Sequence, residues 1–376
     1  MRILNVNMSI EPVYGGGTAE RTVQISRALS NAGISCDILT TAIPYKNSEP
    51  SGLDGINLVA LDCINKRYLI PKLSKRIISD AVSKADIVHL MNHWTVINAL
   101  VYIFAKQQNK PYVVCPAGSL PLFGRSMSLK KLYNGVVGRK IIFEASGHIA
   151  ISKNEIPHFE SYGVSREKIQ IIPNGIDPAE FDKKSIRHFR QKFGLGYAPF
   201  LLFVGRLNFI KGPDLLIAAF KKIKSKYNDY HLVFSGPDGG MLETLKKKAQ
   251  VYNLSDCIHF TGYIAGSEKS SAFHAANLLV IPSRQEAMSI VVLEAGITGT
   301  PVLLTDKCGF NEVADISGGK VVSATEKGLR NGLDEILKNS DKLFDMGCNL
   351  KKFVETHYTW NIMIKKYLDM YNRILT

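Results

Sequence analysis

The sequence predicts an α/β protein of two doubly wound domains, and three observations support this fold class. The chain has 376 residues, of which 45% are hydrophobic, and this length suits two domains of ordinary size better than one. Short apolar segments rich in branched residues alternate with segments of helical periodicity. This alternation starts again near the middle of the chain, and parallel strands need helical crossovers, so each run predicts one parallel sheet covered by helices.

The first run begins with an apolar segment at 3–8, which predicts a strand. Three glycines follow at positions 15–17, and the periodicity of 18–33 predicts a helix. Further short apolar segments predict strands at 36–40, 87–90, 112–115 and 148–151. We place this domain at residues 1–180, and we expect an amphipathic helix at 358–376 to pack back on it.

The second run has the same pattern and predicts a second domain at 181–357. Strands are expected at 199–205, 231–235, 258–260, 278–281 and 302–305. Helices are expected at 213–224, 241–252 and 290–298. Ligands of open α/β sheets bind at the carboxyl ends of the strands, so we expect the ligand site in a cleft between the two domains.

The composition limits the compartment and the kind of partner. The longest apolar stretch, 95–105, is too short to cross a bilayer, and the first residues lack the features of a signal peptide. Six widely spaced cysteines without a C-x-x-C pair are typical of reduced thiols in a cytoplasmic protein. The net charge of +14 favours polyanionic partners, namely nucleic acid, anionic lipid or phosphorylated small molecules.

The sharpest candidate site is the segment between Glu286 and Glu294. We expect a helix to begin near Ser289, so the amides of Met288, Ser289 and Ile290 lie at its positive end, where an anion binds favourably. A carboxylate accepts two hydrogen bonds from a pair of neighbouring hydroxyls, so an acid on each side of an anion site suits a nucleotide diphosphate sugar. The alternative is a surface pair of acids; Glu294 argues against it, because it follows an apolar run and would be half-buried without a partner.

Two further segments carry residues that suit a phosphorylated ligand. Arg206 and Lys211 follow the strand at 199–205, and two cations there could neutralise a diphosphate leaving group. Gly16 and Gly17 allow backbone amides to approach a ligand closely, although a plain tight turn explains them equally well. Neither a D-x-D sequence nor a third ligand for His89 and His93 is present, so we expect no metal and no cofactor.

Taken together, these residues resemble glycosyltransferase family 4, the retaining enzymes of the GT-B architecture, which consists of two Rossmann-like domains facing across a cleft. The resemblance covers nearly the whole chain. Besides the glycines, it rests on motifs at 86–89, 171–177, 204–212, 234–237 and 280–283, and on the Glu-x7-Glu motif at 286 and 294.

The resemblance implies a role for each of these residues. Glu286 would contact the donor sugar and Glu294 the nucleotide ribose. Arg206 and Lys211 would bind the donor diphosphate without a metal, while Gly16 and Gly17 would pack against the donor from the first domain. Retention would follow front-face departure, in which the leaving phosphate assists deprotonation of the acceptor hydroxyl. Selection of the base is expected around His259, Thr261 and Tyr263.

One departure from the family concerns the histidine of the cleft. Relatives often have a histidine in a Ser-Pro-His-Gly turn, where this chain has Ala117. We hypothesise that His93 supplies the imidazole instead. The equal alternative is that His93 is a hydrogen-bonded structural residue.

The acceptor side is suggested by a basic tract. No acidic residue occurs between 87 and 143, and this tract contains Arg125, Lys130, Lys131, Arg139 and Lys140. Each cation near an anionic leaflet contributes about 1 kcal/mol. We therefore expect peripheral docking on the inner face of the cell membrane, towards a lipid-linked or lipopolysaccharide acceptor. A merely basic surface is the alternative.

The leading functional hypothesis is a retaining, metal-independent glycosyltransferase that moves a hexose-type sugar from a UDP- or GDP-sugar to a cell-surface glycan. A nucleotide-sugar epimerase or a sugar-phosphate synthase of the same fold is the alternative. A nucleic-acid-binding protein fits the charge but leaves Glu286 and Glu294 unexplained, so we expect no nucleic-acid partner. A non-catalytic binding protein is disfavoured because every donor motif is present.

Overall fold

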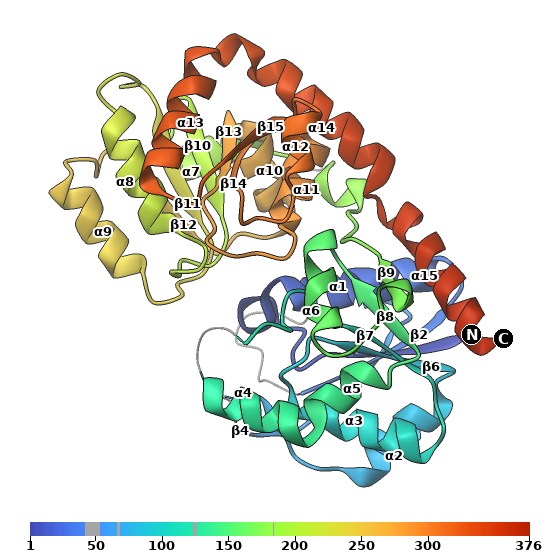
Figure 1. Cartoon of the computed structure of the whole chain (residues 1–376). Helices are drawn as coiled ribbons and strands as arrows, with labels where there is room; N and C mark the ends of the chain where they lie inside the picture. Colours follow the sequence, from blue (N-terminus) through green and yellow to red (C-terminus); the bar gives the residue numbers. More distant parts are fainter. Residues whose placement is uncertain (42–52, 66–67, 123–125, 183) are drawn as a thin grey trace. The chain divides into compact units, whose positions relative to one another are not determined.

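The computed structural model describes residues 1–41, 53–65, 68–122, 126–182 and 184–376. The chain divides into two compact units (Figure 1). Unit 1 comprises Met1–Gly175 and Trp360–Thr376, and unit 2 comprises Ile176–Thr359. The boundary therefore falls before residue 180, and the C-terminal helix belongs to unit 1.

Unit 1 is built on a seven-stranded parallel sheet with the order β3-β2-β1-β6-β7-β8-β9. Its strands are β1 (Arg2–Val6), β2 (Ser35–Thr41), β3 (Asn57–Leu61), β6 (Ile87–Met91), β7 (Tyr112–Cys115), β8 (Gly147–Ala150) and β9 (Ile169–Ile171). The central strands are almost entirely buried because helices cover both faces of the sheet, and their residues are mostly apolar. A small antiparallel pair, β4 (Cys63–Asn65) and β5 (Ile70–Pro71), lies outside this sheet.

The helices of unit 1 form two layers (Figure 1). They are α1 (Pro12–Asn31), α2 (Lys75–Lys84), α3 (Val96–Gln107), α4 (Met127–Tyr133), α5 (Arg139–Phe143), α6 (Ile156–Glu160) and α15 (Trp360–Leu375), with a π-helical turn η1 (Asn134–Gly138) between α4 and α5. Figure 1 shows α1 and α15 on one face of the sheet and α2, α3 and α5 on the other.

Helix α15 is attached to α1 by buried polar contacts. The indole Nε1 of Trp360 donates to Gln24 at 3.0 Å, and the guanidinium of Arg21 donates to the hydroxyl of Tyr367 at 2.5 Å. Arg21 also donates to the side chain of Asn174, at the end of the first stretch of unit 1. These bonds explain why the C-terminal segment belongs to unit 1.

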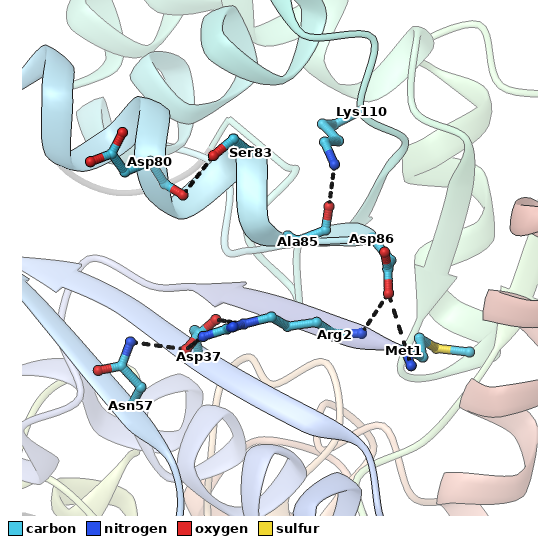
Figure 2. A network of polar contacts seen from close by, with 9 residues as sticks. All are labelled: Met1, Arg2, Asp37, Asn57, Asp80, Ser83, Ala85, Asp86 and Lys110. Atoms are coloured by element: carbon cyan, nitrogen blue, oxygen red, sulfur yellow. Dashed lines mark hydrogen bonds and ion pairs between the residues drawn. The ribbon is translucent and has the colours of Figure 1, made fainter.

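A polar network ties together four neighbouring strands of unit 1, β3, β2, β1 and β6, near their amino ends (Figure 2). The guanidinium of Arg2 donates to both carboxylate oxygens of Asp37, at 2.6 and 2.9 Å, and Asn57 donates to the same carboxylate at 2.9 Å. The backbone amide of Arg2 donates to Asp86 at 2.8 Å. Ligands of such sheets bind at the carboxyl ends of the strands. This network therefore joins the strands at the end of the sheet that lies away from the ligand-binding end.

Unit 2 contains a six-stranded parallel sheet with the order β12-β11-β10-β13-β14-β15. Its strands are β10 (Phe200–Val204), β11 (His231–Ser235), β12 (Ile258–Gly262), β13 (Leu278–Ile281), β14 (Val302–Thr305) and β15 (Gly319–Val322). Counted along the chain, this is the order 3-2-1-4-5-6 of a dinucleotide-binding fold. Its topological switch point lies between β10 and β13.

Helices cover both faces of the second sheet as well (Figure 1). Its main helices are α7 (Ile186–Lys192), α8 (Pro213–Ile223), α9 (Leu242–Val251), α10 (Gly266–Ala275), α11 (Ile290–Thr298), α12 (Glu312–Asp315), α13 (Glu326–Lys338) and α14 (Leu343–His357). Helix α8 packs on α9 and α13, while α11 packs on α10 and α14. The structure therefore confirms two doubly wound parallel-sheet domains.

Within the described ranges, no helix combines the length and the apolar character that a membrane span requires.

Candidate functional site

Two of the predicted site segments meet at the switch point of unit 2. The segment 205–212 leaves the carboxyl end of β10, and the segment 282–289 leaves the carboxyl end of β13, which is its neighbour in the sheet. Gly212 has a φ of +69°, and a Cβ on it would lie 2.1 Å from the carbonyl oxygen of Pro282. The two segments are therefore in direct backbone contact, and this is the place where open α/β sheets bind their ligands.

A charged pair connects the two segments. The ammonium of Lys211 lies 3.0 Å from Oε1 of Glu286, whose side chain is only 9% exposed. The hydroxyl of Ser283 donates to the same carboxylate oxygen. The structure thus brings together Lys211 and Glu286, which the sequence placed in one site.

A second ion pair makes this corner of the sheet rigid. The guanidinium of Arg284 donates to both carboxylate oxygens of Asp214, at 2.8 and 2.7 Å, and to the carbonyl of Phe209 at 2.6 Å. Burial would raise the pKa of Asp214, but the hydrogen bonds and charge of Arg284 lower it overall. This bidentate contact fixes the loop that carries Lys211 relative to the loop that carries Glu286.

The N-terminus of α11 follows these charges, with Ser289 in the N-cap position. The backbone amide of Ser289 donates to the carbonyl of Cys308 at 3.2 Å. The expectation that this amide faces an anion is therefore wrong, because the loop after β14 already uses it. The hydroxyl of Ser289, however, is buried and has no hydrogen-bond partner among the described residues.

Glu294 lies on the second turn of α11 and is 2% exposed. Its Oε1 lies 2.5 Å from the ammonium of Lys269 on α10. Glu294 is thus buried, as the argument against a surface pair of acids required, and the sequence did not indicate its ion-pair partner. Lys269 is the most important residue of this region that sequence reasoning missed.

The glycine at 309 lets the loop after β14 approach the loop after β13. Gly309 has a φ of +66°, and a Cβ on it would lie 1.9 Å from the carbonyl oxygen of Ala287. Nearby, burial and the charge of Glu286 raise the pKa of the Cys308 thiol to about 12, so this cysteine stays protonated at neutral pH.

The three residues expected near the base do not lie together. His259 is near the amino end of β12, where its Nε2 lies 2.8 Å from Nδ1 of His231 and the two rings stack. Thr261 and Tyr263 lie at the carboxyl end, and the hydroxyl of Thr261 donates to Ser235 at 3.0 Å. Ligands bind at the carboxyl ends of the strands, so Thr261 and Tyr263 are better placed than His259 to lie near the base of a nucleotide.

The glycines of unit 1 follow β1, at its own switch point between β1 and β6. The sequence suggested that these glycines form a loop before the helix, but in the structure they lie within the helical segment. Helix α1 already begins at Pro12 and is interrupted at Gly16, which has φ 59° and ψ −145°. Beside this break, the side chain of Asn92 donates to Asn7 at 2.9 Å and to Thr18 at 3.2 Å.

His93 is 1% exposed and lies among aromatic rings. Its Nε2 is hydrogen-bonded at 3.0 Å to the side chain of Asn134, and the rings of Trp94, Tyr133 and Tyr162 lie 4.4 to 5.6 Å away, centroid to centroid. Burial lowers the pKa of His93 to about 4. These contacts favour the structural alternative for His93.

Four of the basic residues expected to face the acceptor side lie on one helical segment. Lys131, Arg139 and Lys140 are exposed, and the ammonium of Lys130 lies 5.5 Å from the centroid of the Trp94 ring. Arg125 lies outside the described residues.

Within the part of the chain that the structure describes, no three His, Cys, Asp or Glu side chains are grouped so that they could hold a metal ion. His89, for example, is fully buried, and its Nδ1 lies 3.1 Å from the hydroxyl of Tyr371.

Comparison with known protein families identifies both units. The family model "Glycosyltransferase Family 4" matches residues 15–180, and the model "Glycosyl transferases group 1" matches residues 185–353. An uncharacterised glycosyltransferase of Methanocaldococcus jannaschii is 26% identical over 99% of this chain and 98% of its own. A GDP-mannose-dependent phosphatidylinositol monomannoside mannosyltransferase of Mycobacterium tuberculosis is 27% identical over 54% of this chain and 55% of its own.

Solved structures with the same fold cover the whole chain. The Anabaena protein HepE in complex with UDP-glucose has a TM-score of 0.82 at 18% identity, covering 99% of this chain and 100% of its own. WaaG, a glycosyltransferase involved in lipopolysaccharide biosynthesis, has a TM-score of 0.70 at 20% identity, covering 97% and 98%. The fold is therefore GT-B, and the chain belongs to the group 1 glycosyltransferases of family 4 type.

Proposed function

We propose that this glycosyltransferase moves a hexose-type sugar from a UDP- or GDP-sugar to a lipid-linked or lipopolysaccharide glycan, with retention and without a metal. The observation that carries the proposal is the group of side chains at the switch point of unit 2. There, Lys211 is paired with Glu286, and the buried hydroxyl of Ser289 at the N-terminus of α11 has no hydrogen-bond partner within the described parts of the chain.

The donor side follows from the chemistry of these groups. Lys211, together with Arg206 on the same loop, supplies positive charge for a diphosphate, and the N-terminus of a helix favours an anion. The Ser289 hydroxyl, which no described residue engages, is a hydrogen-bond donor at that end. Glu286 and Glu294 are carboxylates that can accept bonds from the hydroxyls of the sugar and the ribose. That HepE was solved with UDP-glucose supports the nucleotide-sugar class.

Retention is proposed through front-face departure. The bond from the anomeric carbon to the diphosphate oxygen breaks, the acceptor oxygen bonds to the same face, and the acceptor proton passes to the leaving phosphate. Two observations support this route over a covalent intermediate. Glu286 is already bound by Lys211 and Ser283, which weakens it as a nucleophile, and the Cys308 thiol is protonated at neutral pH.

The acceptor class is supported by relatives and by charge. The mycobacterial relative is named as acting on a phosphatidylinositol mannoside, and the structural neighbour WaaG as involved in lipopolysaccharide biosynthesis. Both acceptors are held in a membrane. A tract without acids from 87 to 143, in a chain of net charge +14, suits work at the inner, anionic face of a membrane.

The test is a transfer assay with radiolabelled UDP- and GDP-sugars, a membrane lipid extract as acceptor, and EDTA. We expect label to enter the lipid fraction in EDTA with one nucleotide sugar, and Glu286→Gln to lower the rate at least about 100-fold. Transfer to free sugar phosphates instead would support the sugar-phosphate synthase. Complete loss of activity in EDTA would contradict the metal-free mechanism.

A further inference from the structure

A tight turn at 116–119 follows directly after β7, and its backbone conformation is unusual. The amide of Ser119 donates to the carbonyl of Pro116 at 3.1 Å, and the two residues between them, Ala117 and Gly118, have φ values of +48° and +87°. A turn with two positive φ values favours glycine, asparagine or aspartate. Alanine rarely adopts such an angle, because its Cβ then lies close to the following carbonyl oxygen. Contacts from outside the turn must therefore hold it in this conformation.

A buried carboxylate holds the turn. Glu155 is 1% exposed and ends the short 3-10 helix η2 (Lys153–Glu155), which follows β8, the strand beside β7. Its Oε1 accepts the amide hydrogen of Gly118 at 2.5 Å, and its Oε2 accepts that of Ile151 at 2.7 Å. Hydrogen bonds to an ionised carboxylate are roughly twice as strong as those between neutral groups. Glu155 thus fastens the turn to the end of β8.

A second buried charge accompanies Glu155. Arg21 on α1 is also 1% exposed. Burial raises the pKa of Glu155, while the two amide bonds and the charge of Arg21 act against this rise. Burying a charge costs desolvation free energy, and well-packed apolar residues of similar size often stabilise a fold as well or better. Packing alone therefore does not explain a carboxylate at position 155, whereas its bond to the turn does.

The turn lies among other unusual backbone at the carboxyl end of the sheet. Asn92, which follows β6, has a φ of +64°, and its amide donates to the carbonyl of Cys115 at 3.1 Å. The indole of Trp94 donates to the carbonyl of Ser119. Residues with such angles cluster at binding and catalytic sites, and open α/β sheets bind ligands at the carboxyl ends of their strands. The turn, whose residues 117–119 are half-buried, is therefore placed to contact a ligand of unit 1.

We propose that Glu155 is a positioning residue for transfer, because it holds the turn at 116–119 in the conformation that binds the acceptor glycan. The groups that we assign to the donor lie in unit 2, so the carboxyl end of the sheet of unit 1 is left for the second substrate. Ala117 and Gly118 carry no polar side-chain atoms, so the turn offers backbone groups to the sugar hydroxyls. The proposal rests on the proposed transfer to a glycan, and it adds a residue on which acceptor binding depends.

The first measurement asks whether Glu155 holds the turn, and it needs no substrate. Glu155→Gln keeps the size of the side chain but has a single acceptor oxygen, so it cannot accept from both amides. In hydrogen exchange of the full chain, the amide of Gly118 or that of Ile151 should exchange at least about tenfold faster. The control Tyr112→Phe removes a buried hydroxyl of β7 that donates to the carbonyl of Ile141 at 3.0 Å, and it should leave both amides unchanged. Unchanged exchange at both amides in Glu155→Gln would overturn the proposal.

The second measurement uses the transfer reaction. The rate of transfer from a labelled nucleotide sugar is followed as the amount of a membrane lipid extract is increased. We expect Glu155→Gln to need at least about tenfold more extract for its half-maximal rate, which corresponds to one lost hydrogen bond to a charged group. Its calorimetric affinity for the nucleotide, and all values of Tyr112→Phe, should match those of the wild type. An unchanged requirement for extract, or an equal loss of nucleotide affinity, would contradict a role at the acceptor.

A rescue variant separates positioning from a general effect on folding, and thermal melts verify that each variant is folded. Glycine adopts a positive φ without steric cost, so Glu155→Gln/Ala117→Gly should keep the turn without the carboxylate and need at least about threefold less extract than Glu155→Gln. No recovery in the folded double variant would show that Glu155 does not act through the turn, and it would overturn the proposal. If the wild type transfers no sugar to the extract, the proposed function fails, whereas hydrogen exchange still decides whether Glu155 holds the turn.

Discussion

The ammonium of Lys269 lies 2.5 Å from the carboxylate of Glu294, and this ion pair joins α10 to α11. Glu294 is 2% exposed, and an ion pair with a cation helps to stabilise a carboxylate that is buried in this way. Lys269 is also the cation nearest to the carboxylate that we assign to the ribose. The relationship makes Lys269 a positioning residue for the donor site.

Removing Lys269 alone should therefore destabilise unit 2. Lys269→Met removes the ammonium that is paired with the buried carboxylate of Glu294, and we expect a loss of about 3 kcal/mol in the free energy of unfolding. The double variant Lys269→Met/Glu294→Leu should recover most of this loss, because it removes both charges. Urea unfolding followed by far-UV circular dichroism measures both values.

The control for this prediction is Lys192→Met, which breaks an exposed ion pair with Glu268 on the same helix α10. We expect a change below about 1 kcal/mol. If Lys269→Met were as mild as Lys192→Met, the ion pair would not stabilise the donor helix.

Lys211 should be needed for transfer more than for folding. Lys211→Met removes the cation that contacts Glu286, and we expect kcat/KM to fall at least about 100-fold, because the leaving diphosphate loses electrostatic stabilisation. Lys307→Met, which breaks the exposed pair with Asp306, is the control and should keep the wild-type value. Steady-state kinetics with the preferred nucleotide sugar provides the test, and equal kcat/KM values for the two variants would argue against the assignment of Lys211.

Gly309 should be intolerant of a side chain. In Gly309→Ala the new Cβ would clash with the carbonyl of Ala287, and the loop of Glu286 would have to move. We expect the nucleotide affinity to fall at least about tenfold. Gly299→Ala has a similar φ, +76°, but open space around the Cβ, so it carries the backbone strain without the clash. Isothermal titration of the two variants separates these effects, and equal affinities would show that the close approach is not required.

Acid should destabilise unit 1 through its buried histidines. Burial lowers the pKa of His93 to about 4 and that of His89 to about 3, below the ordinary value of 6.5. The unfolded chain therefore binds more protons below pH 6.5, and the free energy of unfolding falls as the pH drops from 6.5 towards 4. The slope is about 1.4 kcal/mol per pH unit for each such histidine.

Tryptophan fluorescence measures this effect in unit 1 alone, because the two tryptophans of the chain, Trp94 and Trp360, both lie there. His93→Phe should reduce the slope of stability between pH 4 and 6.5. A slope equal to that of the wild type would mean that His93 is protonated as easily in the folded protein as in the unfolded chain.

Most of the fold could be predicted from the sequence, and the strands of the two large sheets that were not predicted lie at the edges of these sheets. The central strands are mostly apolar because both faces are covered, so β10 and β13, which are apolar throughout, are easily recognised in the sequence. The strands β9 and β15 lie at sheet edges, where residues are only half-buried, and their patterns are correspondingly weak. The π turn η1 has no sequence signature, since it depends on the contacts of Asn134 with His93 and Tyr162.

The candidate site was predictable where it follows strands and not where it depends on contacts between helices. Lys211 and Glu286 each follow a strand, and neighbouring parallel strands bring their carboxyl ends together. Lys269 reaches Glu294 from another helix, and nothing in the local sequence of α10 reports that contact. For the same reason, the use of the Ser289 amide by Cys308 could not be foreseen.

The most direct test of the donor site is calorimetric titration of the wild type and of Glu294→Ala with UDP and GDP, in EDTA. The account predicts that one nucleotide binds the wild type without a metal and that Glu294→Ala weakens this binding at least about tenfold. Glu268→Ala, which removes a half-buried carboxylate of α10 that is paired with Lys192, should not weaken it. At about 100 times its dissociation constant, the nucleotide should also stabilise the protein by about 2.7 kcal/mol. Binding of neither nucleotide, or equal affinity in wild type and Glu294→Ala, would contradict a donor site at α11.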